Sequence, residues 1–128
     1  MKTIDITGLV DNLHNILFIN KKKTNYKIGC FSLPISIITE QLNNLNYLDS
    51  SYVVENLDLS NIPTYDLIFI DSLSDIDNIR ELFYNMKFGT LLYSIDKIEL
   101  PNSYSNRKDI KFETFYNNGK LVEFIIKF

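Results

Sequence analysis

One apolar run bounded by aspartates constrains the fold of this chain more than any other segment. Residues 65–71 have the sequence Tyr-Asp-Leu-Ile-Phe-Ile-Asp. A strand with consecutive apolar residues is buried on both faces, which is typical of a parallel sheet. Apolar residues at helical spacing follow, and residues 90–95 then have the pattern of a second strand. Residues 65–95 therefore predict a strand, helix, strand crossover unit.

The ends of this helix have their own signals. Ser74 and Asp77 predict its start, because a serine and an acidic residue three positions later can form a capping box. Gly89 predicts its end near Phe88, since glycine readily adopts the left-handed conformation that terminates helices.

A second crossover unit is predicted upstream. Tyr26–Phe31 has a strand pattern, and Pro34 suits the first turn of a helix. That helix would bury the apolar residues Ile35, Ile38, Leu42 and Leu45. Residues 51–57 predict the strand that closes the unit, ahead of the buried run at 65–71.

The two ends of the chain differ in how clearly they can be interpreted. Asn117-Asn118-Gly119 separates strand-like residues 110–116 from residues 120–128, which predicts an antiparallel hairpin. Residues 1–20 remain open: Ile4 and Ile6 favour a short strand, whereas Leu13, Ile16 and Leu17 fit a helix. The predicted class is α/β, with a Rossmann-like, mostly parallel sheet flanked by helices and ending in an antiparallel C-terminal hairpin. The 128 residues contain no internal repeat or linker, so we expect residues 1–128 to form a single domain.

Composition excludes several kinds of function. A net charge of −3 provides no basic field for a nucleic acid backbone, which leaves only local patches at residues 21–23 and 104–108. The single Cys30 and single His14 cannot form a Cys/His zinc cluster or an internal disulfide. No signal peptide or membrane span is predicted. We expect a cytoplasmic protein that binds neither membranes nor nucleic acids.

Four segments resemble parts of a known protein family: residues 27–34, 52–56, 65–71 and 87–92. They resemble the second, third and fourth strands and the start of the fifth strand of class I S-adenosylmethionine-dependent methyltransferases. The match covers residues 26–128. It implies a cofactor site that would be lined by Gly29, Phe31, Asn56, Asp58, Asp71 and Ser72.

The chain departs from the family at its cofactor-binding residues. If residues 16–19 form the first strand, only residues 21–25 separate it from the next strand, so the glycine-rich loop and the first helix are missing. The acidic residue that binds the ribose corresponds to Phe31, which cannot accept a hydrogen bond. The polar residue that contacts the adenine corresponds to Asn56 or Asp58.

Asp71 is the strongest single candidate for chemistry, because open α/β sheets bind ligands at the carboxyl ends of their strands. Ser72, Asp75 and Asp77 make this the densest acidic cluster, although capping of the next helix also explains Asp75 and Asp77. In the loop before the hairpin, Tyr104 and Arg107 are weaker binding candidates.

Two functions lead, ahead of a nucleic-acid-binding module that would use residues 21–23 and 104–108 and that the acidic net charge disfavours. The loss of the cofactor loop favours a non-catalytic binding or regulatory protein, without a cofactor, that binds a protein partner or itself. The alternative is a compact enzyme that uses S-adenosylmethionine or another nucleotide in a remodelled site at the strand ends.

Overall fold

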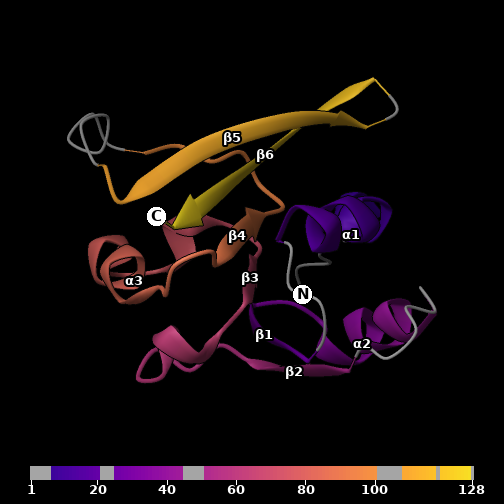
Figure 1. Ribbon diagram of the computed structural model, residues 1–128, viewed down its shortest axis with the longest axis horizontal. Helices are drawn as coiled ribbons and strands as arrows, with labels where there is room; N and C mark the ends of the chain where they lie inside the picture. Colours follow the sequence, from indigo (N-terminus) through magenta and orange to yellow (C-terminus); the bar gives the residue numbers. More distant parts are fainter. Residues whose placement is uncertain (1–6, 21–24, 45–50, 101–107, 118, 128) are drawn as a thin grey trace.

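The computed structural model describes residues 7–20, 25–44, 51–100, 108–117 and 119–127 (Figure 1). It is an α/β structure in which helices flank one six-stranded sheet. The elements are α1 (Thr7–Asn20), β1 (Tyr26–Phe31), α2 (Ile35–Asn44), β2 (Tyr52–Asn56), η1 (Ile62–Thr64), β3 (Leu67–Ile70), η2 (Leu73–Asp75), α3 (Ile79–Asn85), β4 (Leu91–Ser94), β5 (Ile110–Asn117) and β6 (Lys120–Lys127).

The sheet is mixed, with the strand order β2-β1-β3-β4-β6-β5. Strands β2, β1, β3 and β4 pair in parallel. Strand β6 runs antiparallel to both β4 and β5. Strands β3 and β4 are buried along their whole lengths, as expected for central strands covered on both faces.

Helices cover the two faces of the sheet unequally. Helices α1 and α2 lie on one side and α3 on the other, as Figure 1 shows. From β1 the chain crosses to β2, on the side of β1 away from β3. From β3 it crosses to β4, on the side of β3 away from β1. Crossovers of one hand that leave in opposite directions place their helices on opposite faces of a sheet. The strand order therefore accounts for the separation of α2 from α3.

Each face has its own apolar core. The first core packs Leu9, Leu13 and Ile16 of α1 and Ile38 and Leu42 of α2 against the sheet. The second core packs residues of η1, η2 and α3 against the opposite face, and includes Ile62, Tyr65, Leu73, Leu82 and Phe83.

Most of the predicted elements are confirmed. The strands at residues 26–31 and 51–57, the crossover unit and the hairpin all form, and Gly119 in the hairpin turn has a φ of +78°. Of the two alternatives left open for residues 1–20, the helix that Leu13, Ile16 and Leu17 fit forms as α1, so the possible first strand at residues 16–19 does not form. Helix α1 buries Leu13, Ile16 and Leu17 along one face, and this helical spacing outweighs the apolar run. Ile4, Ile6 and Leu45 lie outside the described residues.

The predicted start of the third helix is wrong. Residues 73–75 form the separate turn η2, in which the side chain of Ser72 accepts a hydrogen bond from the Ser74 amide. Helix α3 begins at Ile79, where Asn78 Oδ1 accepts from the Glu81 amide at 3.1 Å. Ile76 is buried in the second core between these two elements, which places a turn where the sequence favoured a continuous helix.

Candidate functional site

The strand order creates one point at which a ligand crevice is expected. Connections leave β1 and β3 in opposite directions, so the carboxyl ends of these two strands flank the topological switch point of the parallel part of the sheet. Phe31 ends β1, and Asp71 and Ser72 follow β3. Asn56 ends the neighbouring strand β2. The structure thus brings Phe31, Asn56, Asp71 and Ser72 to one edge of the sheet.

The crevice itself is occupied by apolar side chains. Phe31 is half-buried and packs against the second core. A pocket beside Phe31 has a volume of about 170 Å³, and its lining combines apolar residues such as Leu59 and Ile62 with polar ones such as Asp77 and Glu81. Small-molecule sites usually enclose roughly 300–1,000 Å³. This pocket is therefore small for a nucleotide or a cofactor.

The turn after β1 has no glycine to expose bare backbone to a ligand. Ser32 has a φ of +59°, in the left-handed region that favours glycine. The next residue, Leu33, is buried in the first core, and the Pro34 carbonyl accepts a hydrogen bond from the Ile38 amide at 3.2 Å. This turn is anchored to the core and begins α2 directly.

Gly29 lies within β1, away from the strand ends. A Cβ atom there would lie 2.7 Å from Leu57 Cδ1 and 3.0 Å from Tyr65 Cε1. These distances are shorter than van der Waals contact, so the missing side chain makes room for the Tyr65 ring. Gly29 has a packing role in this structure.

A polar cluster around Tyr65 was not predicted from the sequence. The Tyr65 hydroxyl donates to Glu55 Oε1 at 2.9 Å and accepts from the Asp58 amide at 2.9 Å. Lys27 Nζ lies 3.6 Å from Glu55 Oε1 and 5.1 Å from the centre of the Tyr65 ring. Burial raises the pKa of Tyr65. The hydroxyl is therefore a neutral donor that holds Glu55 and the turn after β2 together.

Asp58 belongs to this turn and is exposed. Its Oδ1 accepts from the Ser60 hydroxyl at 2.6 Å and from the Ser60 amide at 3.0 Å. The hydrogen bonds from Ser60 lower the pKa of Asp58. An aspartate two residues before a serine is a common turn signal, so the sequence held an indication of this arrangement.

Asp71 and Ser72 each have defined backbone roles. The Asp71 amide donates to the Phe31 carbonyl at 3.4 Å, and its carbonyl accepts from the Asp96 amide at 2.8 Å. These bonds join the ends of β1, β3 and β4. Ser72 caps η2 and lines an open groove of about 470 Å³, together with Asp77, Asp96, Lys97 and Glu99. With three carboxylates and one ammonium group, this lining carries excess negative charge.

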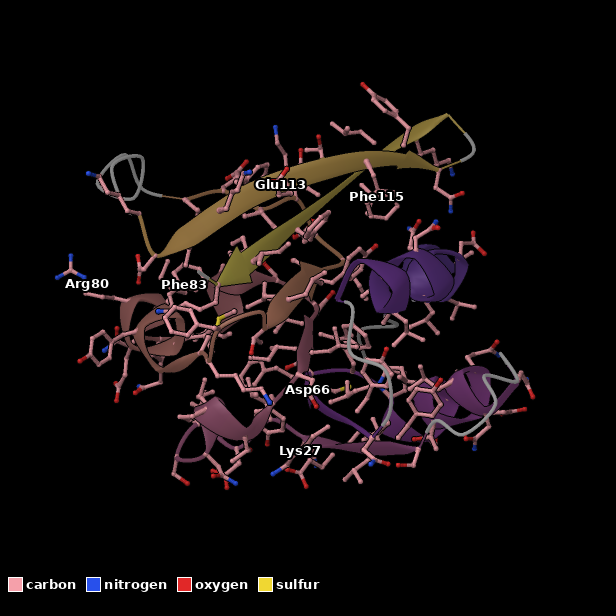
Figure 2. All side chains as sticks on the ribbon, in the orientation of Figure 1. Lys27, Asp66, Arg80, Phe83, Glu113 and Phe115 are labelled. Carbon is pink, nitrogen blue, oxygen red and sulfur yellow. The ribbon has the colours of Figure 1, made fainter. Side chains whose placement is uncertain are left out.

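The other buried aspartate, Asp66, lies at the opposite edge of the sheet, just before β3 (Figure 2). Its carboxylate accepts from the Lys27 amide at 2.8 Å and pairs with Lys87 Nζ at 2.7 Å. These partners compensate the burial of its charge, and they give Asp66 a structural role.

The remaining candidates contribute little to a site. Burial raises the pKa of the Cys30 thiol to about 12. Within the described ranges, no three His, Cys, Asp or Glu side chains lie close enough together to hold a metal ion. The side chains of His14 and Asp75, the lysines at 21–23, and Tyr104 and Arg107 lie outside the described residues. None of the helices described is both long and apolar enough to span a membrane.

Comparison of the sequence with protein-family models and with curated proteins gave no match.

Proposed function

We propose that this chain is a non-catalytic binding or regulatory protein with a Rossmann-like fold, whose partner is another polypeptide chain. The observation that carries the proposal is the occupation of the switch-point crevice by Phe31 and its apolar neighbours. A cofactor would have to displace these side chains from the second core, at a cost in buried apolar surface.

The likeness to class I methyltransferases belongs to this proposal, in a register one strand earlier for β1 and β2 than the one given above. In a doubly wound sheet, the first strand lies at the switch point, and the second strand pairs with its outer side. On this basis β1 corresponds to the family's first strand and β2 to its second strand. The acidic residue of the second strand is then Glu55, and the turn after β1 replaces the glycine-rich loop.

This register supports the absence of a cofactor. Glu55 accepts a hydrogen bond from the Tyr65 hydroxyl at 2.9 Å and lies 3.6 Å from Lys27 Nζ. A ribose would compete with both internal partners. We infer that Glu55, at the position of the family's ribose-binding acid, instead holds β2 to Tyr65, just before β3.

The alternative, a nucleotide-using enzyme, has one observation in its favour. The open groove beside Ser72 has a volume of about 470 Å³, which is within the range of small-molecule sites. Asp77, Asp96 and Glu99 outnumber Lys97 in its lining. Repulsion between these carboxylates and a phosphate group disfavours a nucleotide there.

Calorimetric titration tests the proposal. S-adenosylmethionine, S-adenosylhomocysteine and ATP are each titrated into the native protein and into Asp71→Asn. We expect no dissociation constant tighter than about 1 mM, which corresponds to about −4 kcal/mol. Micromolar binding to the native protein that is lost in Asp71→Asn, with an unchanged melting temperature, would overturn the proposal in favour of the enzyme.

A further inference from the structure

The last strand of the sheet offers an edge for pairing with another chain. Strand β5 is the terminal strand beside β6, and within the described residues no strand pairs with its outer side. It is eight residues long, contains no proline, and pairs with β6 residue for residue without a bulge. The opposite edge strand, β2, has only five residues. A long, regular edge is a site for β-sheet extension unless it is protected.

One side of the sheet beside this edge exposes three large apolar side chains. Phe112 and Tyr116 of β5 and Leu121 of β6 are 45%, 74% and 49% exposed. Tyr116 lies opposite Leu121 in the hairpin register, so these two side chains are cross-strand neighbours. The short helix α3 lies over the end of the hairpin that contains Ile110, Ile125 and Lys127, and Phe112, Tyr116 and Leu121 lie exposed beyond it.

The other side of β5 carries charges that complement one another. Side chains alternate between the two faces along a strand, so Lys111 and Glu113 share the face of Phe115, which packs against the first core. Their side chains pair within the strand at 2.7 Å. When two copies of β5 run antiparallel, the lysine of each copy can lie opposite the glutamate of the other, so the strand is complementary to a second copy of itself.

We propose that a second copy of this chain pairs antiparallel with β5, with the two-fold axis at Phe112. In this register Lys111 lies opposite the second copy's Glu113, and Glu113 lies opposite the second copy's Lys111. Phe112 lies opposite its own counterpart on the exposed apolar side. The inference rests on the proposed function, for which it names the polypeptide partner.

The charges favour this register over those with the axis at residues 111, 113 or 114. A shift of the axis to Lys111 or Glu113 would place two like charges directly opposite each other, which destabilises a strand pair. An axis at Thr114 would place Lys111 opposite Asn117 and Glu113 opposite Phe115, without a pairing of opposite charges. An axis between two residues would pair odd-numbered positions of one copy with even-numbered positions of the other. The charged side of one strand would then lie on the same face as the apolar side of the other.

Charge reversal tests the interface. We expect the native chain to sediment as a dimer, and we expect Lys111→Glu and Glu113→Lys to weaken dimerisation on the order of tenfold or more, since each creates two like-charge pairs. Mixing the two variants should restore a dimer, because two carboxylates at positions 111 and 113 of one copy then face two ammonium groups at positions 113 and 111 of the other. Circular dichroism and melting temperatures establish that both variants are folded.

Cross-linking tests the register in a chain with native charges. Phe112→Cys should form an intermolecular disulfide with oxidised glutathione as oxidant, whereas the matched control Thr114→Cys should not. Cys30 is only 1% exposed and does not compete.

Three results would overturn the inference: a native chain that stays monomeric at about 1 mM, variants that dimerise as well as the native chain, or a disulfide at position 114 in place of 112. A monomer that binds no cofactor refutes only the dimer, whereas micromolar cofactor binding refutes the proposed function.

Discussion

At the scale of single residues, the contact between Gly29 and Tyr65 links the sheet to the polar cluster at its edge. Strand β1 can pass close beneath the Tyr65 ring because Gly29 has no side chain. The ring position in turn sets the hydroxyl at 2.9 Å from Glu55 Oε1. Gly29, which the family resemblance implied as part of a cofactor site, therefore serves packing, and only its spatial neighbours reveal this.

Gly29→Ala should destabilise the protein by about 1–3 kcal/mol, the usual cost of overpacking a core. The added Cβ would lie 2.7 Å from Leu57 Cδ1 and 3.0 Å from the Tyr65 ring, so both must move. Urea unfolding monitored by circular dichroism measures the loss. Gly8→Ala is the matched control, because its Cβ would lie at an ordinary 3.6 Å from the Tyr93 hydroxyl. Equal stability of the two variants would contradict the packing role of Gly29.

The buried thiol of Cys30 should resist modification. Burial raises its pKa from 9.0 to about 12, so the reactive thiolate is depleted about a thousandfold. Between pH 9 and about 12 the unfolded chain releases the thiol proton while the folded protein keeps it. The free energy of unfolding is therefore at its full value below pH 9 and falls as the pH rises from 9 toward 12. We expect a disulfide reagent at pH 8 to label Cys30 only after denaturation with guanidinium. Rapid labelling of the native protein would show that the thiol is accessible.

At the scale of elements, α3 begins at a different capping residue from the one that the sequence analysis predicted. The prediction was Ser74 with Asp77, whereas in the structure Asn78 caps the helix together with Glu81. Asn78→Ala should cost about 1 kcal/mol of unfolding free energy, because Asn78 Oδ1 accepts from the Glu81 amide. Ser74→Ala should cost less, since among the described residues the exposed Ser74 hydroxyl hydrogen-bonds to Ser72 Oγ, another exposed side chain. A larger loss in Ser74→Ala than in Asn78→Ala in urea titrations would favour the sequence-based start of the helix.

Local patterns predicted the elements well where a pattern had one meaning. The Asn-Asn-Gly turn and the aspartate-bounded run at 65–71 were such patterns, and both elements form. Residues 7–20 carried two meanings, because Ile16 and Leu17 suit a strand as well as a helix. The choice was made by tertiary packing, since these residues are buried on one face of α1 against the sheet.

At the scale of the whole molecule, the order of the strands decided what the candidate site could be. Sequence alone placed Phe31, Asn56, Asp71 and Ser72 at strand ends, and the parallel order brings those ends to one edge. It could not identify the partners of Glu55, because Tyr65 and Lys27 reach it from two other segments of the chain. Such contacts depend on the pairing of β2 with β1, which is not encoded in any local pattern.

The junction of the hairpin with the rest of the molecule depends on one buried lysine. Lys127 Nζ donates to the Phe83 carbonyl at 2.7 Å and the Tyr84 carbonyl at 3.4 Å, and pairs with Asp109 at 3.1 Å. It thereby joins β6 to the last turn of α3 and to the residue before β5. Lysine is favourable there because the carbonyls at a helix C-terminus carry partial negative charge.

Lys127→Met keeps most of the side-chain volume and removes these bonds, so it should destabilise the protein by about 2–4 kcal/mol. Lys120→Met in the same strand is the matched control and should change stability by less than about 0.5 kcal/mol, because Lys120 is exposed. Both are measured from urea midpoints with unchanged slopes. If the two variants had equal midpoints, the hairpin would be held by its apolar contacts alone, through Ile125 in the second core and Phe124 in the first.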